Sequence, residues 1–100
     1  MRQQFKSPNN QRIFELFIKV IKDLNQKGVV PIIYGSLGLY LLIGEQGEID
    51  DIDMLIEDQS FLTTIKEVSI NNGFNLDPDH ERELIGNNTY ISFLDLNDIE

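Results

Sequence analysis

Apolar and polar residues follow one another with two different periods along this chain, and the period predicts which segments are helices and which are strands. In residues 9–28, apolar side chains recur every three or four positions and charged side chains fill the opposite side, which predicts an amphipathic helix. Ser7, Asn9 or Asn10 could cap its start. Residues 58–73 repeat the helical spacing, so a second amphipathic helix is expected there.

Short segments rich in β-branched and aromatic residues predict the strands. Residues 29–35 and 49–57 are of this kind, and 74–76 could form a further short strand. Between the first two strands, residues 36–44 begin with serine and end with glycine, which favours a short helix, although a strand stays open as the alternative. This segment is apolar all round, so we expect it to be buried. Residues 81–96 alternate around a central Gly-Asn-Asn and predict a β-hairpin.

The order of these segments predicts the fold class. A first half in which helices and strands alternate, followed by a hairpin, is typical of an α/β (α+β) protein with a mixed sheet flanked by helices. One hundred residues suffice for a single domain, so we expect one domain over residues 1–100. Because the chain stops directly after its last predicted strand, this is either a minimal domain or one truncated at its C-terminus.

Charge and composition exclude several classes of function. The chain has 17 acidic against 8 basic residues and a net charge of -9, which argues against nucleic acid as a partner of this domain alone. It has no cysteine, so disulfides, thiolate zinc sites and a cysteine nucleophile are excluded. The polar N-terminus and the lack of any long apolar run predict a cytoplasmic protein with no membrane partner.

Two carboxylates in the second predicted strand are the main candidate for chemistry. Side chains alternate along a strand, so Asp51 and Asp53 share one face, and the apolar Ile52 and Met54 share the other. The two Cβ atoms are expected roughly 6–7 Å apart, so both carboxylates can reach one hard cation or two closely spaced ones. Alternatively, the strand begins in solvent and these acids are only its polar start. Asp50 more naturally belongs to the preceding loop.

The dipeptide Gly35-Ser36 lies where the first strand gives way to the short helix. Glycine lets the backbone approach a ligand closely, and the free N–H groups at a helix start favour phosphate. An ordinary turn followed by a helix cap is the alternative interpretation. The combination is more specific than either motif, because a strand carrying Asp-x-Asp follows this helix.

Residues 34–56, "YGSLGLYLLIGEQGEIDDIDMLI", resemble the nucleotidyltransferase superfamily related to DNA polymerase β. The hallmark of that family is Gly-Gly or Gly-Ser at the head of a helix, followed by a strand with Asp-x-Asp between apolar residues. The resemblance implies that Asp51 and Asp53 bind Mg²⁺ or Mn²⁺ and that Gly35 and Ser36 hold the phosphates of a nucleoside triphosphate, with ATP expected. It also implies a third carboxylate on a later strand, for which Asp95 is the candidate and Asp98 the weaker alternative. These three aspartates would be both metal ligands and catalytic residues.

The sequence departs from the family pattern in its basic residues. Relatives that act on tRNA have an arginine shortly after the glycine pair, where this chain has Leu39 or Tyr40. A triphosphate needs counter-charge beyond the metal ions, which Lys66, Arg82 or a C-terminal region could supply. His80, the only histidine, is a weak catalytic candidate, because some relatives have a similar His-Glu step.

Two functions from different classes follow. The first is a metal-dependent nucleotidyltransferase that moves a nucleotidyl group from the triphosphate to an acceptor hydroxyl, on a protein, a small molecule or a tRNA end. The second is a non-catalytic binding module of the same fold, antitoxin-like or regulatory, that acts through a protein partner. A plain α/β domain with solvated acids is a third, weaker interpretation.

Overall fold

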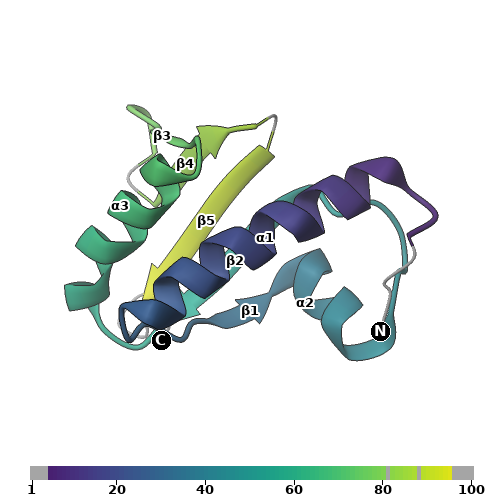
Figure 1. Ribbon diagram of the computed structural model, residues 1–100, viewed down its shortest axis with the longest axis horizontal. Coiled ribbons are helices and arrows are strands. Elements are labelled where there is room, and N and C mark those ends of the chain that lie inside the picture. The colour runs from purple at the N-terminus through teal and green to yellow at the C-terminus, as the bar shows by residue number, and fades with distance from the viewer. Residues whose placement is uncertain (1–4, 81, 88, 96–100) are drawn as a thin grey trace.

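The computed structural model describes residues 5–80, 82–87 and 89–95, and of residue 95 only the backbone. Its elements, in chain order, are α1 (Pro8–Gln26), β1 (Ile32–Tyr34), α2 (Gly35–Ile43), β2 (Asp51–Ile56), the 3₁₀ turn η1 (Gln59–Phe61), α3 (Leu62–Asn71), β3 (Asn75–Leu76), β4 (Glu83–Gly86) and β5 (Thr89–Asp95). The strands form one five-stranded sheet flanked by helices (Figure 1). The predicted α+β class with a mixed sheet is therefore confirmed.

The sheet has the strand order β1-β2-β5-β4-β3. β2 and β5 lie side by side in the centre and run parallel, whereas all other neighbouring pairs are antiparallel. β4 and β5 form the predicted hairpin, in which Asn87 adopts a positive φ of 51°. A parallel pair needs a long crossover, which here runs through α3 and the hairpin.

α1 is the amphipathic helix that the periodicity predicts. Of the three candidates for its cap, Ser7 is the N-cap, and its Oγ accepts a hydrogen bond from the backbone N of Asn10 (3.3 Å). Ile13, Phe17 and the apolar residues one and two turns further on are buried against the sheet. The apolar stripe therefore both fixes the helix and attaches it to the core.

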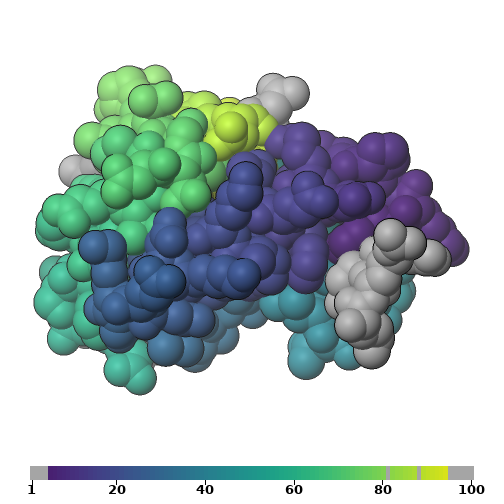
Figure 2. All heavy atoms as spheres, in the orientation of Figure 1, coloured from purple at the N-terminus to yellow at the C-terminus, as the bar shows by residue number. Residues whose placement is uncertain are grey.

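One face of the sheet is covered by α1 and α3, which lie side by side over it (Figures 1 and 2). The covered face supplies the core side chains of the three central strands, which are Ile52, Met54, Ile56, Leu84, Ile91 and Phe93. The opposite face, which we call the open face, carries side chains that are half-buried or exposed. They are Tyr34 of β1, Asp51, Asp53 and Leu55 of β2, Glu83 and Ile85 of β4, and Tyr90 and Ser92 of β5.

The segment 36–44 is helical, as favoured, but the expectation that it is buried all round is wrong. Leu37 and Gly38 are the buried residues of α2, whereas Leu42 and Ile43 are 83% and 63% exposed. The reason is its position beyond the end of β1 (Figure 1), where Leu37 and Gly38 are buried and Tyr40 packs on Phe14 of α1, with ring centroids 5.6 Å apart. Apolar composition alone could not reveal which side of the helix these contacts leave exposed.

Candidate functional site

Asp51 and Asp53 begin β2 and lie half-buried on the open face, as the alternation predicts. Asp53 is opposite Tyr34 of β1 on one side and opposite Ser92 of β5 on the other. Asp50 lies outside the strand with an exposed side chain, as expected of a loop residue. The two carboxylates therefore project from the centre of the sheet on its uncovered side.

The start of β2 is held in place by side chains from distant parts of the chain. Asn10, fully buried on α1, accepts a hydrogen bond from the backbone N of Ile49 (2.7 Å) through Oδ1 and donates to the carbonyl of Gly47 (2.8 Å) through Nδ2. The Thr89 hydroxyl at the start of β5 donates to the carbonyl of Asp50 (2.6 Å). Sequence reasoning gave Asn10 only the role of a candidate cap, since nothing local reveals these partners.

Gly35 is where the head of α2 meets the carboxylate pair. Its φ of 70° lies in the left-handed region, which glycine adopts without strain. A Cβ at this position would overlap Oδ2 of Asp53. Gly35 and Ser36 are both exposed, so the first turn of α2 and the Asp53 carboxylate lie together at the surface. The structure thus brings the two sequence motifs into contact.

The environment of the pair disfavours two negative charges. Burial raises the pKa of Asp53, and the charges of Asp51 and Glu83 raise it further. Burial, followed by the charges of Asp50 and Glu83, likewise raises the pKa of Asp51. Neither carboxylate has a hydrogen bond or an ion pair among the groups that the structure describes. Within residues 5–80, 82–87 and 89–94, then, no basic side chain compensates the charge of either carboxylate.

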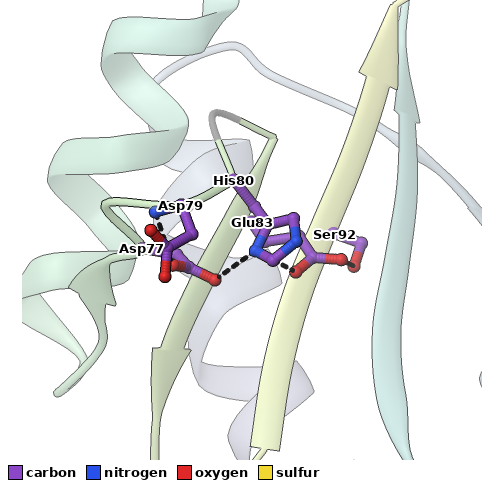
Figure 3. A network of polar contacts seen from close by, with 5 residues as sticks. All are labelled: Asp77, Asp79, His80, Glu83 and Ser92. Atoms are coloured by element: carbon purple, nitrogen blue, oxygen red, sulfur yellow. Dashed lines mark hydrogen bonds and ion pairs between the residues drawn. The ribbon is translucent and has the colours of Figure 1, made fainter.

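Glu83 is a functional candidate that sequence reasoning missed. It pairs with Ser92, which pairs with Asp53, so Asp53, Ser92 and Glu83 form one row across β2, β5 and β4. The Ser92 hydroxyl donates to Oε1 of Glu83 at 3.5 Å (Figure 3). Alternation along the hairpin could have placed Glu83 on the open face, but only the register of three strands shows that it lies in line with Asp53.

Asp95, the predicted third carboxylate, ends β5, where its backbone is opposite Ile56. That position is three residues past Ser92, about 10 Å along the strand. The register therefore does not bring the backbone of Asp95 beside Asp53. The side chain of Asp95 and the whole of Asp98 lie outside the described residues, so the role of Asp95 stays a prediction.

His80 lies in the turn between β3 and β4 and belongs to a polar cluster with Asp77 and Glu83 (Figure 3). Its Nδ1 is 2.9 Å from Oδ2 of Asp77 and 3.8 Å from Oε2 of Glu83. The hydrogen bond to Asp77 is the main cause of a raised His80 pKa. The pKa of Asp77 is lowered, chiefly by the backbone N–H of Asp79 and then by His80.

The counter-charge candidates Lys66 and Arg82 lie beside the cluster of Asp77, His80 and Glu83. Both line a cavity of about 470 Å³ between α3 and the β3–β4 turn, together with Asp77, His80 and Glu83. Gly35 and Ser36 do not line it. Glu83 therefore connects the two regions, because it lines the cavity and also lies in the row with Asp53. The two basic residues line the cavity, whereas the head of α2 does not.

Comparison with known proteins gives one relative and no family. No protein-family model and no solved structure matches the chain. The chain is similar to the uncharacterized protein YnaI of Bacillus subtilis (strain 168), with 31% identity over 94 residues, which cover 89% of this chain and 60% of YnaI. The chain therefore spans less than two thirds of the length of that relative. Within the described part of the chain, none of the helices is both long and apolar enough to cross a bilayer.

Proposed function

We propose that this chain is a nucleotidyltransferase domain that uses a nucleoside triphosphate, with ATP as the expected donor. The observation that carries the proposal is the contact between the carboxylate of Asp53 and the backbone of Gly35 at the head of α2. Phosphate groups bind at helix starts, and divalent cations that accompany them bind carboxylates, so the two halves of such a site meet at this contact.

The carboxylates fit a hard divalent cation. Asp51, Asp53 and Glu83 offer only oxygen ligands, which Mg²⁺ and Mn²⁺ prefer. A bound cation would offset the repulsion between these carboxylates and the cost of burying the charge of Asp53, since both effects arise from negative charge. When bound, the cation supplies Lewis-acid polarisation of the phosphate oxygens and offsets their charge.

The protein groups would then position the reactants. The N–H groups and hydroxyl of Gly35-Ser36 would hold the outer phosphates, and Asp51 and Asp53 would hold the cation. In the transfer, the acceptor oxygen forms a bond to the α-phosphorus, and the bond from that phosphorus to the bridging oxygen breaks. Pyrophosphate leaves with the electron pair, and a carboxylate takes the proton of the acceptor hydroxyl. Asp95 is the predicted carboxylate for this proton transfer. Glu83 is an alternative, because it lies in one row with Ser92 and Asp53.

Transfer of label from α-labelled ATP tests the proposal directly. Purified protein with Mg²⁺ would be incubated with candidate acceptors: protein hydroxyls, small molecules and tRNA ends. A cation bound in the site contributes several kcal/mol, so Asp51→Asn/Asp53→Asn is expected to lower transfer at least about 100-fold. Asp50→Asn is the matched control, because it removes the neighbouring exposed carboxylate from the loop. Transfer that survives in the double variant, or fails equally in the control, contradicts the assignment.

A non-catalytic binding module is the second candidate, and one observation favours it. Apolar side chains of β1 and α2 are exposed, including Ile32, Leu39, Leu42 and Ile43. Contiguous exposed apolar surface is typical of protein interfaces. The two functions differ in their response to ligand: a binding module of this kind shows no rise in its unfolding midpoint with Mg²⁺ and ATP, whereas the enzyme does.

A further inference from the structure

A second set of metal-ligating side chains lies in the turn between β3 and β4, apart from the Asp51–Asp53 pair. Asp77, His80 and Glu83 are spaced three residues apart, and two backbone hydrogen bonds keep these positions close together in space. His80 N donates to the Asp77 carbonyl and Glu83 N to the His80 carbonyl, both at 3.2 Å. One ligating atom from each side chain lies within 4.8 Å of the other two (Figure 3).

The separations fit a small divalent ion. Two atoms that each bind Zn²⁺ at about 2.0–2.2 Å can be at most about 4.4 Å apart. The imidazole Nδ1 of His80 is 2.9 Å from Asp77 Oδ2 and 3.8 Å from Glu83 Oε2, so two of the three separations are inside that limit. The third, between Asp77 and Glu83, is within 4.8 Å, so a small shift of one side chain brings all three atoms to bonding distance of one ion. An imidazole nitrogen beside two carboxylate oxygens suits Zn²⁺ and other transition ions, whereas Mg²⁺ prefers oxygen alone.

Of the three side chains, Asp77 is shielded from solvent, whereas His80 is 62% exposed and Glu83 is 35% exposed. The Asp77 side chain is only 7% exposed, and the backbone N of Asp79 donates to its Oδ1 (2.9 Å), which leaves Oδ2 directed at His80. Such a hydrogen bond orients a ligand from outside the coordination sphere. All three side chains also line the cavity of about 470 Å³, which has room for a further ligand.

We propose that Asp77, His80 and Glu83 bind one divalent transition-metal ion of the Zn²⁺ type, with its remaining coordination positions open to the cavity. Three protein ligands and open positions are the arrangement of zinc sites that bind a further molecule. In the metal-free protein Nδ1 of His80 and Oδ2 of Asp77 are within hydrogen-bond distance of each other, at 2.9 Å. This inference does not depend on nucleotidyl transfer, because Asp77 and His80 take no part in the proposed transfer and Glu83 is there only the alternative to Asp95.

Calorimetric titration of tag-free protein with Zn²⁺ tests the site, with folding of each variant checked by circular dichroism. The wild type is expected to bind one Zn²⁺ saturably, and His80→Ala or Asp77→Asn to weaken binding at least about tenfold. Asp79→Asn is the matched control, since it removes an exposed carboxylate from the same turn and keeps the backbone N–H to Asp77. It is expected to bind within about twofold of the wild type, as is Asp51→Asn/Asp53→Asn. No saturable binding by the wild type, or equal losses in Asp77→Asn and Asp79→Asn, overturns the proposal.

A second measurement needs no substitution, because His80 is the only histidine of the chain. Zn²⁺ is expected to shift or broaden the imidazole resonances of His80 in the NMR spectrum at one equivalent, and Mg²⁺ at the same concentration to leave them unchanged. Imidazole resonances that do not respond to Zn²⁺ contradict the site even if the calorimetry shows binding elsewhere. A response to Zn²⁺ with no nucleotide transfer would refute the proposed enzyme and leave this site standing.

Discussion

The carboxylates of Asp53 and Asp77 lie in two regions that shift the pKa of a carboxyl group in opposite directions. Asp53 lies on the open face, where burial and the charges of Asp51 and Glu83 raise its pKa. Asp77 lies in the β3–β4 turn, where a backbone N–H and His80 lower its pKa. Asp53 lies within β2 and Asp77 directly follows β3, and the chain places different groups next to each: two carboxylates beside Asp53, and a backbone N–H and an imidazole beside Asp77.

The comparison indicates how each region responds to an added cation. A carboxylate held against repulsion gains most from a cation, since no existing partner must be given up. Where a carboxylate is already paired with an imidazole, the imidazole adds a nitrogen ligand, but the metal must replace the existing hydrogen bond between the two groups. We therefore expect Mg²⁺ to bind at the open face and Zn²⁺ to bind at the β3–β4 turn. The following variants test the two regions one at a time.

The largest effect is expected from removing the support of the open face. Asn10→Ala leaves the backbone N of Ile49 and the carbonyl of Gly47 without their partner. Buried groups without hydrogen bonds cost about 1–3 kcal/mol each, so we expect unfolding to require roughly 2–4 kcal/mol less. Denaturant unfolding measures this change, and Asn25→Ala, exposed near the end of the same helix, is the control. Equal stabilities of the two variants would contradict the role of Asn10.

Substitution of Gly35 tests the contact between the helix head and the carboxylate. Gly35→Ala places a Cβ against Asp53 at a φ of 70°, whereas Gly28→Ala introduces the same left-handed cost at a φ of 81° into open space. Gly28→Ala is expected to cost roughly 1–2 kcal/mol, and Gly35→Ala to cost more. The excess is expected to shrink in an Asp53→Ala background, as measured by chemical denaturation. An excess that persists there would show that the carboxylate is not what Gly35 accommodates.

The pH dependence of Asp53→Asn sharpens the comparison further. Because the folded pKa of Asp53 is raised, the unfolded chain loses this proton first as pH rises above the ordinary value of 3.8. Stability is therefore lost as pH rises from 3.8 through the raised pKa, and it stays lost at neutral pH. Asp53→Asn is expected to raise the thermal midpoint at pH 7 in EDTA, with the gain disappearing near pH 3. A variant less stable than the wild type at pH 7 would contradict the repulsion.

The smallest effect concerns the turn, where His80 is expected to titrate above its ordinary value of 6.5 because of Asp77. The raised pKa means that this contribution to stability is present below pH 6.5 and is lost as pH rises through the folded value. NMR titration of the imidazole in EDTA measures the pKa. Asp77→Asn is expected to lower it clearly and Asp79→Asn only slightly, and equal effects would remove the case for a specific pair.

Local patterns were enough to predict the framework of this protein. The helical stripe of α1 and the alternation of β2 each lie within one segment, so the sequence revealed the helix, the strand and the shared face of Asp51 and Asp53. The contact between Gly35 and Asp53 could be anticipated for a related reason, because β1, α2 and β2 follow one another in the chain and β1 pairs with β2.

Features that depend on distant segments were beyond the sequence. The row from Asp53 to Glu83 exists only because β5 inserts between β2 and β4, and no local pattern encodes that register. The same holds for Asn10, whose partners are about 40 positions away. The exposure of α2 was missed because it depends on which elements pack there, and apolar composition carries no such information.

One measurement tests the central claim most directly: the order of the thermal midpoints of the wild type and Asp51→Asn/Asp53→Asn, in EDTA and then in Mg²⁺ with ATP. In EDTA the double variant is expected to be the more stable, because it lacks the repelling pair. At about 100 times the dissociation constant, ligand stabilises the wild type by about 2.7 kcal/mol, several degrees for a domain of this size, so the order reverses. Asp50→Asn removes one charge that repels Asp51 but none of the proposed ligands, so it is expected to be slightly more stable than the wild type in EDTA and to gain as much as the wild type from Mg²⁺ with ATP. An order that stays the same with and without Mg²⁺ and ATP would contradict a cation site at Asp51 and Asp53.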